Sequence, residues 1–218
     1  MKLIFGKKEI IEKRTAKIIA IETLKILKKQ KYAIIGISGG RTIPNILRKL
    51  KNINLPWKRI HIFLTDENLV PITSRQSNYR LVSSFLEDIP EKNIHDFNSQ
   101  ESASDYYKKL KNLKGKFDIV LLSSGKNGEI ASLFPNHKSI KSTHSGYIEI
   151  KDSPIYPKER ISATSSLIRK SKVSILLFIG NEKKEAYENF INPRINFIDC
   201  PAKIVNTIQK SYVLTDIN

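Results

Sequence analysis

Two adjacent glycines, Gly39 and Gly40, stand in a short polar segment directly after an apolar run at residues 32–37. Glycines let the backbone turn tightly and bring its N–H groups to a ligand, and the start of a following helix favours an anion. Hydroxyl and guanidinium groups, which bind phosphate oxygens, flank the two glycines. The segment therefore predicts a phosphate-binding turn made of Ser38, Gly39, Gly40, Arg41 and Thr42.

The spacing of these glycines differs from that of the two common phosphate-binding motifs. It follows neither the G-x-x-x-x-G-K-[ST] loop nor the G-x-G-x-x-G dinucleotide fingerprint. An ordinary tight turn between a strand and a helix also favours glycine and serine. Taken alone, the segment leaves both interpretations open.

Carboxylates follow two further apolar runs. Asp66 and Glu67 come directly after residues 59–64, and Glu129 follows residues 117–122 by way of a glycine-containing segment. Adjacent carboxylates bind sugar hydroxyls or act as a general acid and base; the alternative is that Asp66 caps a turn and Glu67 is solvated. Glu129 opens a predicted helix, where the dipole stabilises a negative charge, so its alternative role is purely structural.

Hydrophobic periodicity indicates the elements that position these segments. Apolar residues recur at helical spacing in some stretches and form short continuous runs, typical of buried strands, in others. The predicted helices cover residues 8–30, 44–50, 77–86, 102–113, 128–134 and 182–190. The predicted strands cover residues 32–37, 59–64, 117–122, 147–150, 160–164, 173–179 and 212–214, and residues 135–158 are expected to consist mainly of loops.

This alternation predicts an α/β fold with a doubly wound, mainly parallel sheet and helices on both faces, a Rossmann-like architecture. We expect one domain spanning residues 1–218, because no linker or repeat interrupts the chain. Ligands of such sheets bind beyond the carboxyl ends of the strands. The three polar segments are therefore expected to meet in a single cleft.

Composition limits the classes of partner. The chain has 38 lysines and arginines against 21 aspartates and glutamates, a net charge of +17. These basic residues are spread along the sequence, without a zinc-finger, zipper or aromatic RNA-binding pattern, which argues against nucleic acid as the main partner. The single cysteine, Cys200, excludes an internal disulfide and a cysteine-rich zinc site. Without a signal segment or a membrane-length apolar run, the sequence predicts a cytoplasmic protein of undetermined oligomeric state.

A series of segments, taken in order, resembles the 6-phosphogluconolactonase family, which shares its fold with glucosamine-6-phosphate isomerases and deaminases. Ala131-Ser132-Leu133-Phe134-Pro135 resembles the lactonase sequence more than the deaminase sequence. The resemblance extends from about residue 31 to the end of the chain. Its segments are residues 38–42, 56–57, 61–63, 66–67, 70–71, 77–80, 117–135, 160–162, 180–183 and 201–202.

The resemblance implies hydrolysis of 6-phospho-D-glucono-1,5-lactone to 6-phosphogluconate, a step of the pentose phosphate pathway. It implies no metal and no organic cofactor, and a small phosphorylated sugar lactone as the partner. Besides the turn at residues 38–42, the residues expected to bind the substrate and its phosphate are Asp66, Glu67, Arg80, Arg160 and Lys183.

The chain departs from the family at the position of the catalytic base. The family pattern Gly-x-Asp-Gly-His reads here Gly125-Lys126-Asn127-Gly128-Glu129, and Asn68 stands where an arginine usually follows Asp-Glu. We expect Glu129 to act as the base with Asn127 beside it, although a carboxylate is a weaker base than an imidazole. Of the histidines, His137 is the one close enough in sequence to substitute.

Three other functions remain open. A catalytically impaired sugar-phosphate-binding homologue would keep the fold and lack the base. Isomerisation or deamination of an amino-sugar phosphate is disfavoured, because that chemistry also uses the missing Asp and His. A nucleic-acid-binding module would show retention on nucleic acid that falls steeply with salt.

Overall fold

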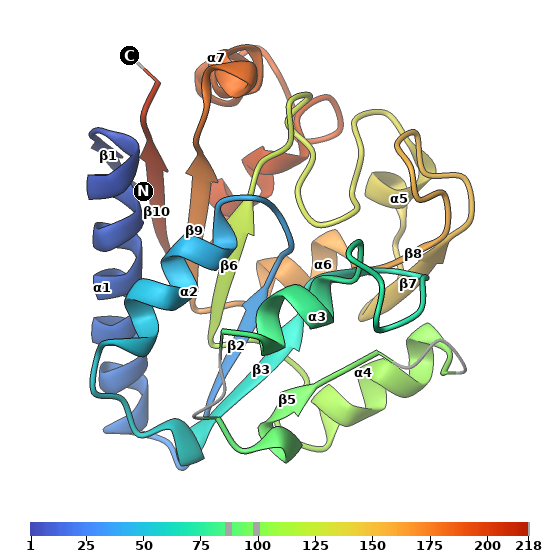
Figure 1. The fold of residues 1–218 in the computed structure, drawn as a ribbon. Helices are drawn as coiled ribbons and strands as arrows, with labels where there is room; N and C mark the ends of the chain where they lie inside the picture. Colours follow the sequence, from blue (N-terminus) through green and yellow to red (C-terminus); the bar gives the residue numbers. More distant parts are fainter. Residues whose placement is uncertain (86–88, 98–100, 218) are drawn as a thin grey trace.

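The central feature is a parallel sheet in the order β1-β10-β9-β6-β2-β3-β5 (Figure 1). The structure is a computed structural model that describes residues 1–85, 89–97 and 101–217. All neighbouring strands of this sheet run parallel. The strands are β1 Lys2–Phe5, β2 Ala33–Ile37, β3 Ile60–Leu64, β5 Ile94–His95, β6 Ile119–Ser123, β9 Val173–Phe178 and β10 Lys210–Thr215.

Helices cover both faces of the sheet, which confirms the predicted doubly wound α/β class (Figure 1). Consecutive residues of β2 enter opposite cores: Ile34 packs in one apolar cluster and Ile35 in the other. One face carries α1 Lys8–Leu27, α2 Ile43–Lys51 and α3 Asn78–Ser83. The other face carries α4 Ala103–Lys111, α6 Ser165–Arg169, α7 Lys184–Ile191 and the 3-10 helix η4 Pro201–Thr207.

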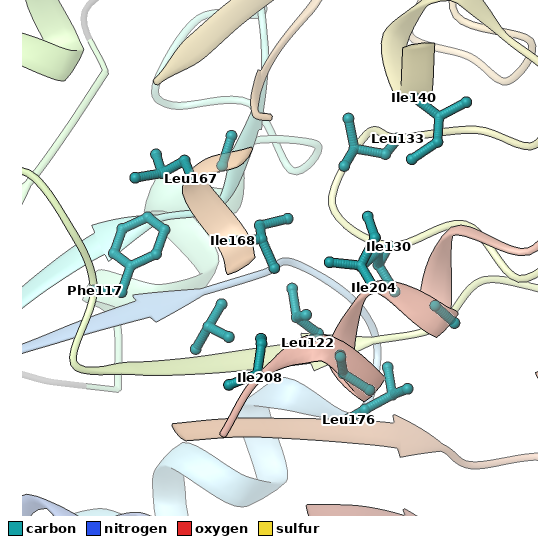
Figure 2. Close-up of a cluster of buried hydrophobic side chains, with 14 of the residues drawn as sticks. Phe117, Leu122, Ile130, Leu133, Ile140, Leu167, Ile168, Leu176, Ile204 and Ile208 are labelled. Atoms are coloured by element: carbon teal, nitrogen blue, oxygen red, sulfur yellow. The ribbon is translucent and has the colours of Figure 1, made fainter. Parts of the chain in front are cut away.

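The core on the second face reaches the glycine-containing segment that follows β6. Figure 2 shows Ile130 and Leu133 among its buried side chains, in the same cluster as Leu122 of β6 and Ile204 of η4. All four are 0% exposed. Burial on this scale stabilises each side chain by roughly 1.5–3 kcal/mol, so the segment is held against the sheet along its length.

A second, antiparallel sheet lies beside the main one. Two of its strands were predicted, at residues 147–150 and 160–164, but its third strand and the separate antiparallel pairing were not. This sheet has the order β4-β8-β7, with β4 Asp66–Asn68, β8 Arg160–Ala163 and β7 Tyr147–Ile150. Its first strand follows β3 after a single residue, Thr65. The register places Asn68 opposite Arg160 and Asp66 opposite Ser162.

The predicted helix over residues 128–134 is wrong. The backbone turns there instead, and an isolated bridge joins Ile130 to Leu133. Gly128 has φ of 82° and Ala131 has φ of 50°, values that a right-handed helix does not contain. The isoleucine, the leucine and the neighbouring Phe134 are all buried, so burial of apolar side chains in a tight turn replaces the helical hydrogen bonds.

Other predicted elements differ at their ends. The first helix ends at Leu27 rather than residue 30, and α7 is preceded by a 3-10 turn, η3 Asn181–Lys183. Within residues 135–158 the structure has a short helix, α5 Lys138–Lys141, as well as β7. Residue 86, the end predicted for the third helix, lies outside the described residues. No helix in the described part of the chain has the length and apolar character to cross a membrane.

The buried His61 of β3 stacks on the partly exposed His95 of the neighbouring strand β5. Their ring nitrogens lie 3.0 Å apart, and the His95 ring stacks on Phe63. Burial lowers the pKa of both rings, that of His95 to about 4. The folded state therefore disfavours protonation, so their contribution to stability is complete above the ordinary histidine pKa, near 6.5, and is lost as pH falls toward about 4.

We predict that His95→Gln flattens this pH dependence, because the amide can keep a hydrogen bond to His61 without titrating. Thermal denaturation between pH 4 and 7 measures the effect. The wild type and the control His144→Gln, at an exposed position, should lose melting temperature more steeply on acidification. Equal slopes in all three proteins would contradict the assignment.

Candidate functional site

A cavity of about 610 Å³ lies beyond the carboxyl ends of β2, β6 and β9. Gly39, Asp66 and Glu129 all line it, so the three polar segments meet in one place. The convergence follows from the topology, because the three segments follow β2, β3 and β6, and β2 is the direct neighbour of both β3 and β6. The other predicted residues that line the cavity are Ser38, Gly40, Arg41, Thr42, Arg160 and Lys183.

The turn after β2 forms one wall of this cavity and leads into the N-terminus of α2. Gly40 has φ of 121°, a conformation that side-chain-bearing residues rarely adopt. A Cβ added to Gly39 would lie 1.9 Å from Oδ1 of Asn78. The Asn78 amide in turn donates to the Asp66 carbonyl at 2.8 Å. A side-chain amide therefore joins the first two polar segments, and glycine is needed to make room for it.

An ion pair crosses the mouth of the cavity. Arg41 Nη2 lies 3.1 Å from Oε1 of Glu182, and the Arg41 side chain is 92% exposed. Exposed pairs of this kind contribute at most about 1 kcal/mol. An anionic ligand can displace Glu182 from Arg41 at little cost.

Asp66 is almost completely enclosed in the cavity wall. Its carboxylate accepts hydrogen bonds from Ser132 Oγ at 2.9 Å and Thr65 Oγ1 at 3.3 Å. Burial raises the pKa of Asp66, while these hydrogen bonds and the charge of Arg160 oppose that rise. Arg160 Nη1 lies 3.5 Å from the same Ser132 hydroxyl. Ser132 thus connects the carboxylate to the guanidinium, a role the sequence analysis missed.

Arg160 also holds the loop between β7 and β8. Its Nε donates to the Pro157 carbonyl at 2.9 Å and its Nη2 to the Tyr156 carbonyl at 3.2 Å. The same loop places Ile155 in the cavity wall. Burial lowers the pKa of Arg160, and the charges of Asp66 and Glu129 oppose this. The guanidinium therefore supports the wall as well as supplying charge to the cavity.

Glu129 points its carboxylate back at its own segment. Oε2 accepts from the Asn127 backbone N–H at 2.9 Å, and the Glu129 carbonyl accepts from the Gly125 N–H at 2.8 Å. A Cβ added to Gly125 would lie 1.9 Å from Oε1. The residue is only 7% exposed. The segment wraps around a fixed carboxylate, and this is why glycine is required at position 125.

Three predicted site residues do not face the cavity. The Glu67 carboxylate caps α3, accepting from the N–H groups of Asn68, Asn78 and Tyr79, each at 2.7 Å. The Arg80 guanidinium donates to a nearby carbonyl on the exposed surface. Asn127 contributes its backbone N–H to Glu129, and the residue itself is exposed. The structure therefore gives these residues structural contacts.

His137 does not approach the cavity either. It caps α5, where its Nδ1 accepts from the Ser139 N–H at 3.2 Å, and its Nε2 lies 3.3 Å from Asp152. Among the residues that the structure describes, no histidine lines the cavity. A base in the cavity must therefore be a carboxylate or the amine of a lysine.

The cavity carries more positive than negative charge. Lys183 of η3 lies inside it, where burial lowers the pKa of its ammonium and the negative charges of Glu182 and Glu129 oppose this. Lys8 and Lys126, which the sequence analysis did not select, also line it. The cationic side chains are Lys8, Arg41, Lys126, Arg160 and Lys183, and the acidic ones Asp66, Glu129 and Glu182. The excess of cations suits a multiply charged anion such as a phosphate ester.

A phosphate-type turn, a buried carboxylate and this excess of cations define a class: proteins that bind a small phosphorylated ligand at the carboxyl edge of a doubly wound sheet. The chain belongs to the family of glucosamine-6-phosphate isomerases and 6-phosphogluconolactonases, whose profile matches residues 6–214. A curated relative, the 6-phosphogluconolactonase of Borreliella burgdorferi, is 37% identical over 201 residues, covering 87% of this chain and 86% of the relative.

Solved structures agree with this assignment. The crystal structure of 6-phosphogluconolactonase from Thermotoga maritima matches with a TM-score of 0.84 at 25% identity, covering 98% of this chain and 97% of that one. The 6-phosphogluconolactonase from Trypanosoma cruzi matches with a TM-score of 0.86 at 24% identity, covering 98% and 94%. At such identity the second match shows the fold alone.

Proposed function

We propose that this protein is a hydrolase that converts 6-phospho-D-glucono-1,5-lactone to 6-phosphogluconate in the pentose phosphate pathway, and that it acts in the cytoplasm. The observation that carries the proposal is the single cavity in which the turn at residues 38–42 and the Glu129 carboxylate both take part. Membership of the family, with relatives named 6-phosphogluconolactonase, supports the same reaction.

The phosphate of the substrate fits the end of the cavity formed by the turn after β2. The backbone N–H groups of the turn at residues 40–42 and the side chains of Arg41 and Lys183 provide donors and positive charge there. The first residues of α2 add no free N–H, because that of Ile43 donates to the Gly40 carbonyl and Pro44 has none. Arg160 stands directly opposite Asn68 in the antiparallel sheet. Its guanidinium therefore supplies charge beside the position where relatives of this chain are expected to have an arginine.

Glu129 is the proposed general base. Its carboxylate takes a proton from water as the water oxygen attacks the C1 carbonyl of the lactone. The cationic side chains of the cavity stabilise the negative charge that develops on the carbonyl oxygen. The C1–O5 bond then breaks, and the proton passes from Glu129 to the leaving O5. The Asn127 N–H holds one carboxylate oxygen and leaves the other available for the water.

We predict that the purified protein accelerates loss of freshly prepared 6-phosphogluconolactone above the spontaneous rate, in proportion to protein concentration. Coupling the product to 6-phosphogluconate dehydrogenase measures this. The second candidate is a sugar-phosphate-binding homologue without activity, favoured by a carboxylate standing where the family has histidine. Binding of 6-phosphogluconate without any acceleration would establish that candidate and overturn the first.

A further inference from the structure

Ser123, the last residue of β6, lies between two groups of the proposed phosphate site. The Ser123 hydroxyl oxygen accepts a hydrogen bond from Lys183 Nζ at 3.0 Å. The Ser123 backbone N–H donates to Ser38 Oγ at 3.1 Å. All three residues line the cavity. They come from the ends of β2 and β6 and from the turn after β9, three adjacent strands of the sheet. A continuous series of hydrogen bonds thus crosses the floor of the cavity.

Ser123 also faces the phosphate-binding turn. A Cβ added to Gly40 would lie 3.8 Å from the Ser123 hydroxyl oxygen. The oxygen is therefore close to the backbone that would surround a phosphate. Sequence analysis did not select Ser123, because a lone serine at the end of an apolar strand carries no signal of its own.

The hydrogen-bonding capacity of these groups is only partly used. A serine hydroxyl has one donor and two acceptor sites, and an ammonium has three donors. The oxygens of Ser38 and Ser123 both accept, and neither hydroxyl donates to another group in the described residues. Lys183 uses one of its donors on Ser123. Two hydroxyl hydrogens and two ammonium hydrogens therefore remain for a ligand, which suits the three terminal oxygens of a phosphate ester.

The hydrogen bond to Ser123 also fixes the position of the Lys183 ammonium relative to the nearby carboxylates. Lys183 experiences the negative charges of Glu129 and Glu182, which also line the cavity. A lysine side chain is long and flexible, so a free ammonium would move toward either carboxylate. The Ser123 hydroxyl holds it at a third place and reduces the ordering cost when the phosphate binds.

We propose that Ser123 is a phosphate-binding and positioning residue, which holds the Lys183 ammonium against the turn after β2 and donates its own O–H to the 6-phosphate. The proposal rests on the proposed function for the identity of the phosphate ester. It concerns binding, so Ser123 does not take part in the bond changes at C1.

The test is Ser123→Ala, measured by lactone kinetics and by the affinities for 6-phosphogluconate and gluconate. Loss of hydrogen bonds to a charged group should raise KM and the Kd of 6-phosphogluconate about tenfold. kcat should stay within about twofold, and the affinity for gluconate, which lacks the phosphate, should not change. Ser123→Thr keeps a hydroxyl and should restore most of the affinity.

Ser174→Ala is the matched control, because Ser174 is a buried strand serine whose hydroxyl bonds Ser211 at 2.8 Å outside the cavity. It should leave both affinities unchanged. Unchanged 6-phosphogluconate binding in Ser123→Ala, or equal weakening of gluconate, would overturn the proposal. If the wild type binds 6-phosphogluconate but does not hydrolyse the lactone, the proposed activity fails, while the binding measurements still decide the role of Ser123.

Discussion

Glu129→Gln should lower kcat for 6-phosphogluconolactone by about 10²–10⁴, the usual contribution of a general base. The amide has nearly the same shape and keeps an oxygen for the Asn127 N–H, which bonds the carboxylate at 2.9 Å. It cannot accept a proton from water. KM should change little, because the phosphate contacts lie on other elements. Progress curves corrected for the spontaneous reaction measure both constants.

Glu188→Gln is the matched control, since Glu188 is an exposed carboxylate on α7 outside the cavity. It should have wild-type kinetics. Glu129→Gln with wild-type kcat would remove Glu129 from the mechanism. The enzyme would then need another group in the cavity as the base, and Asp66, the other buried carboxylate there, would be the next to test.

The meeting of the three polar segments could be predicted, because the rule that parallel strands present their carboxyl ends at one edge needs only the order of strands and helices. Individual side chains were harder to place. Asp66 and Glu67 are neighbours with the same chemistry, yet only Asp66 lines the cavity. The reason is β4, a three-residue strand that turns alternate side chains to opposite sides. A strand this short has no periodic pattern to detect.

The prediction of a helix after β6 was wrong for a different reason. Residues 128–134 begin with a glycine and a glutamate, and the apolar residues that follow resemble one face of an amphipathic helix. The structure instead has positive φ at Gly128 and Ala131, and it buries Ile130 and Leu133 together. Their partners, such as Ile204, are distant in sequence. Packing from remote segments decided this conformation, and no local pattern carries that information.

The same limit explains why contacts between elements escaped the sequence analysis. Ser132 and Ser123 have no pattern that distinguishes them from other serines. Each has a role only through a hydrogen bond to a residue on another strand or turn. Ser132 donates to Asp66 at 2.9 Å, and Ser123 accepts from Lys183 at 3.0 Å. The glycines were recognised because backbone freedom is a local property, although the groups that require it, Asn78 and Glu129, are seen only in the fold.

Lys183→Ala should raise KM for the lactone about 10- to 100-fold, the range expected for losing hydrogen bonds between a charged donor and a phosphate. kcat should fall much less, because Glu129 and its N–H contact remain. Lys184→Ala is the matched control: this lysine is adjacent in sequence, exposed, and outside the cavity. A variant at position 183 with unchanged KM would place the phosphate elsewhere in the cavity.

The pH dependence of binding identifies the same ammonium independently of the reaction. Burial lowers the pKa of Lys183 below its ordinary value. The protonated form binds phosphate, so affinity for 6-phosphogluconate should be lost as pH rises through this lowered pKa. The wild type and Lys184→Ala should show that alkaline loss, and Lys183→Ala should bind weakly without it. Calorimetric titration measures it, and the same alkaline loss in Lys183→Ala would assign the titration to another group.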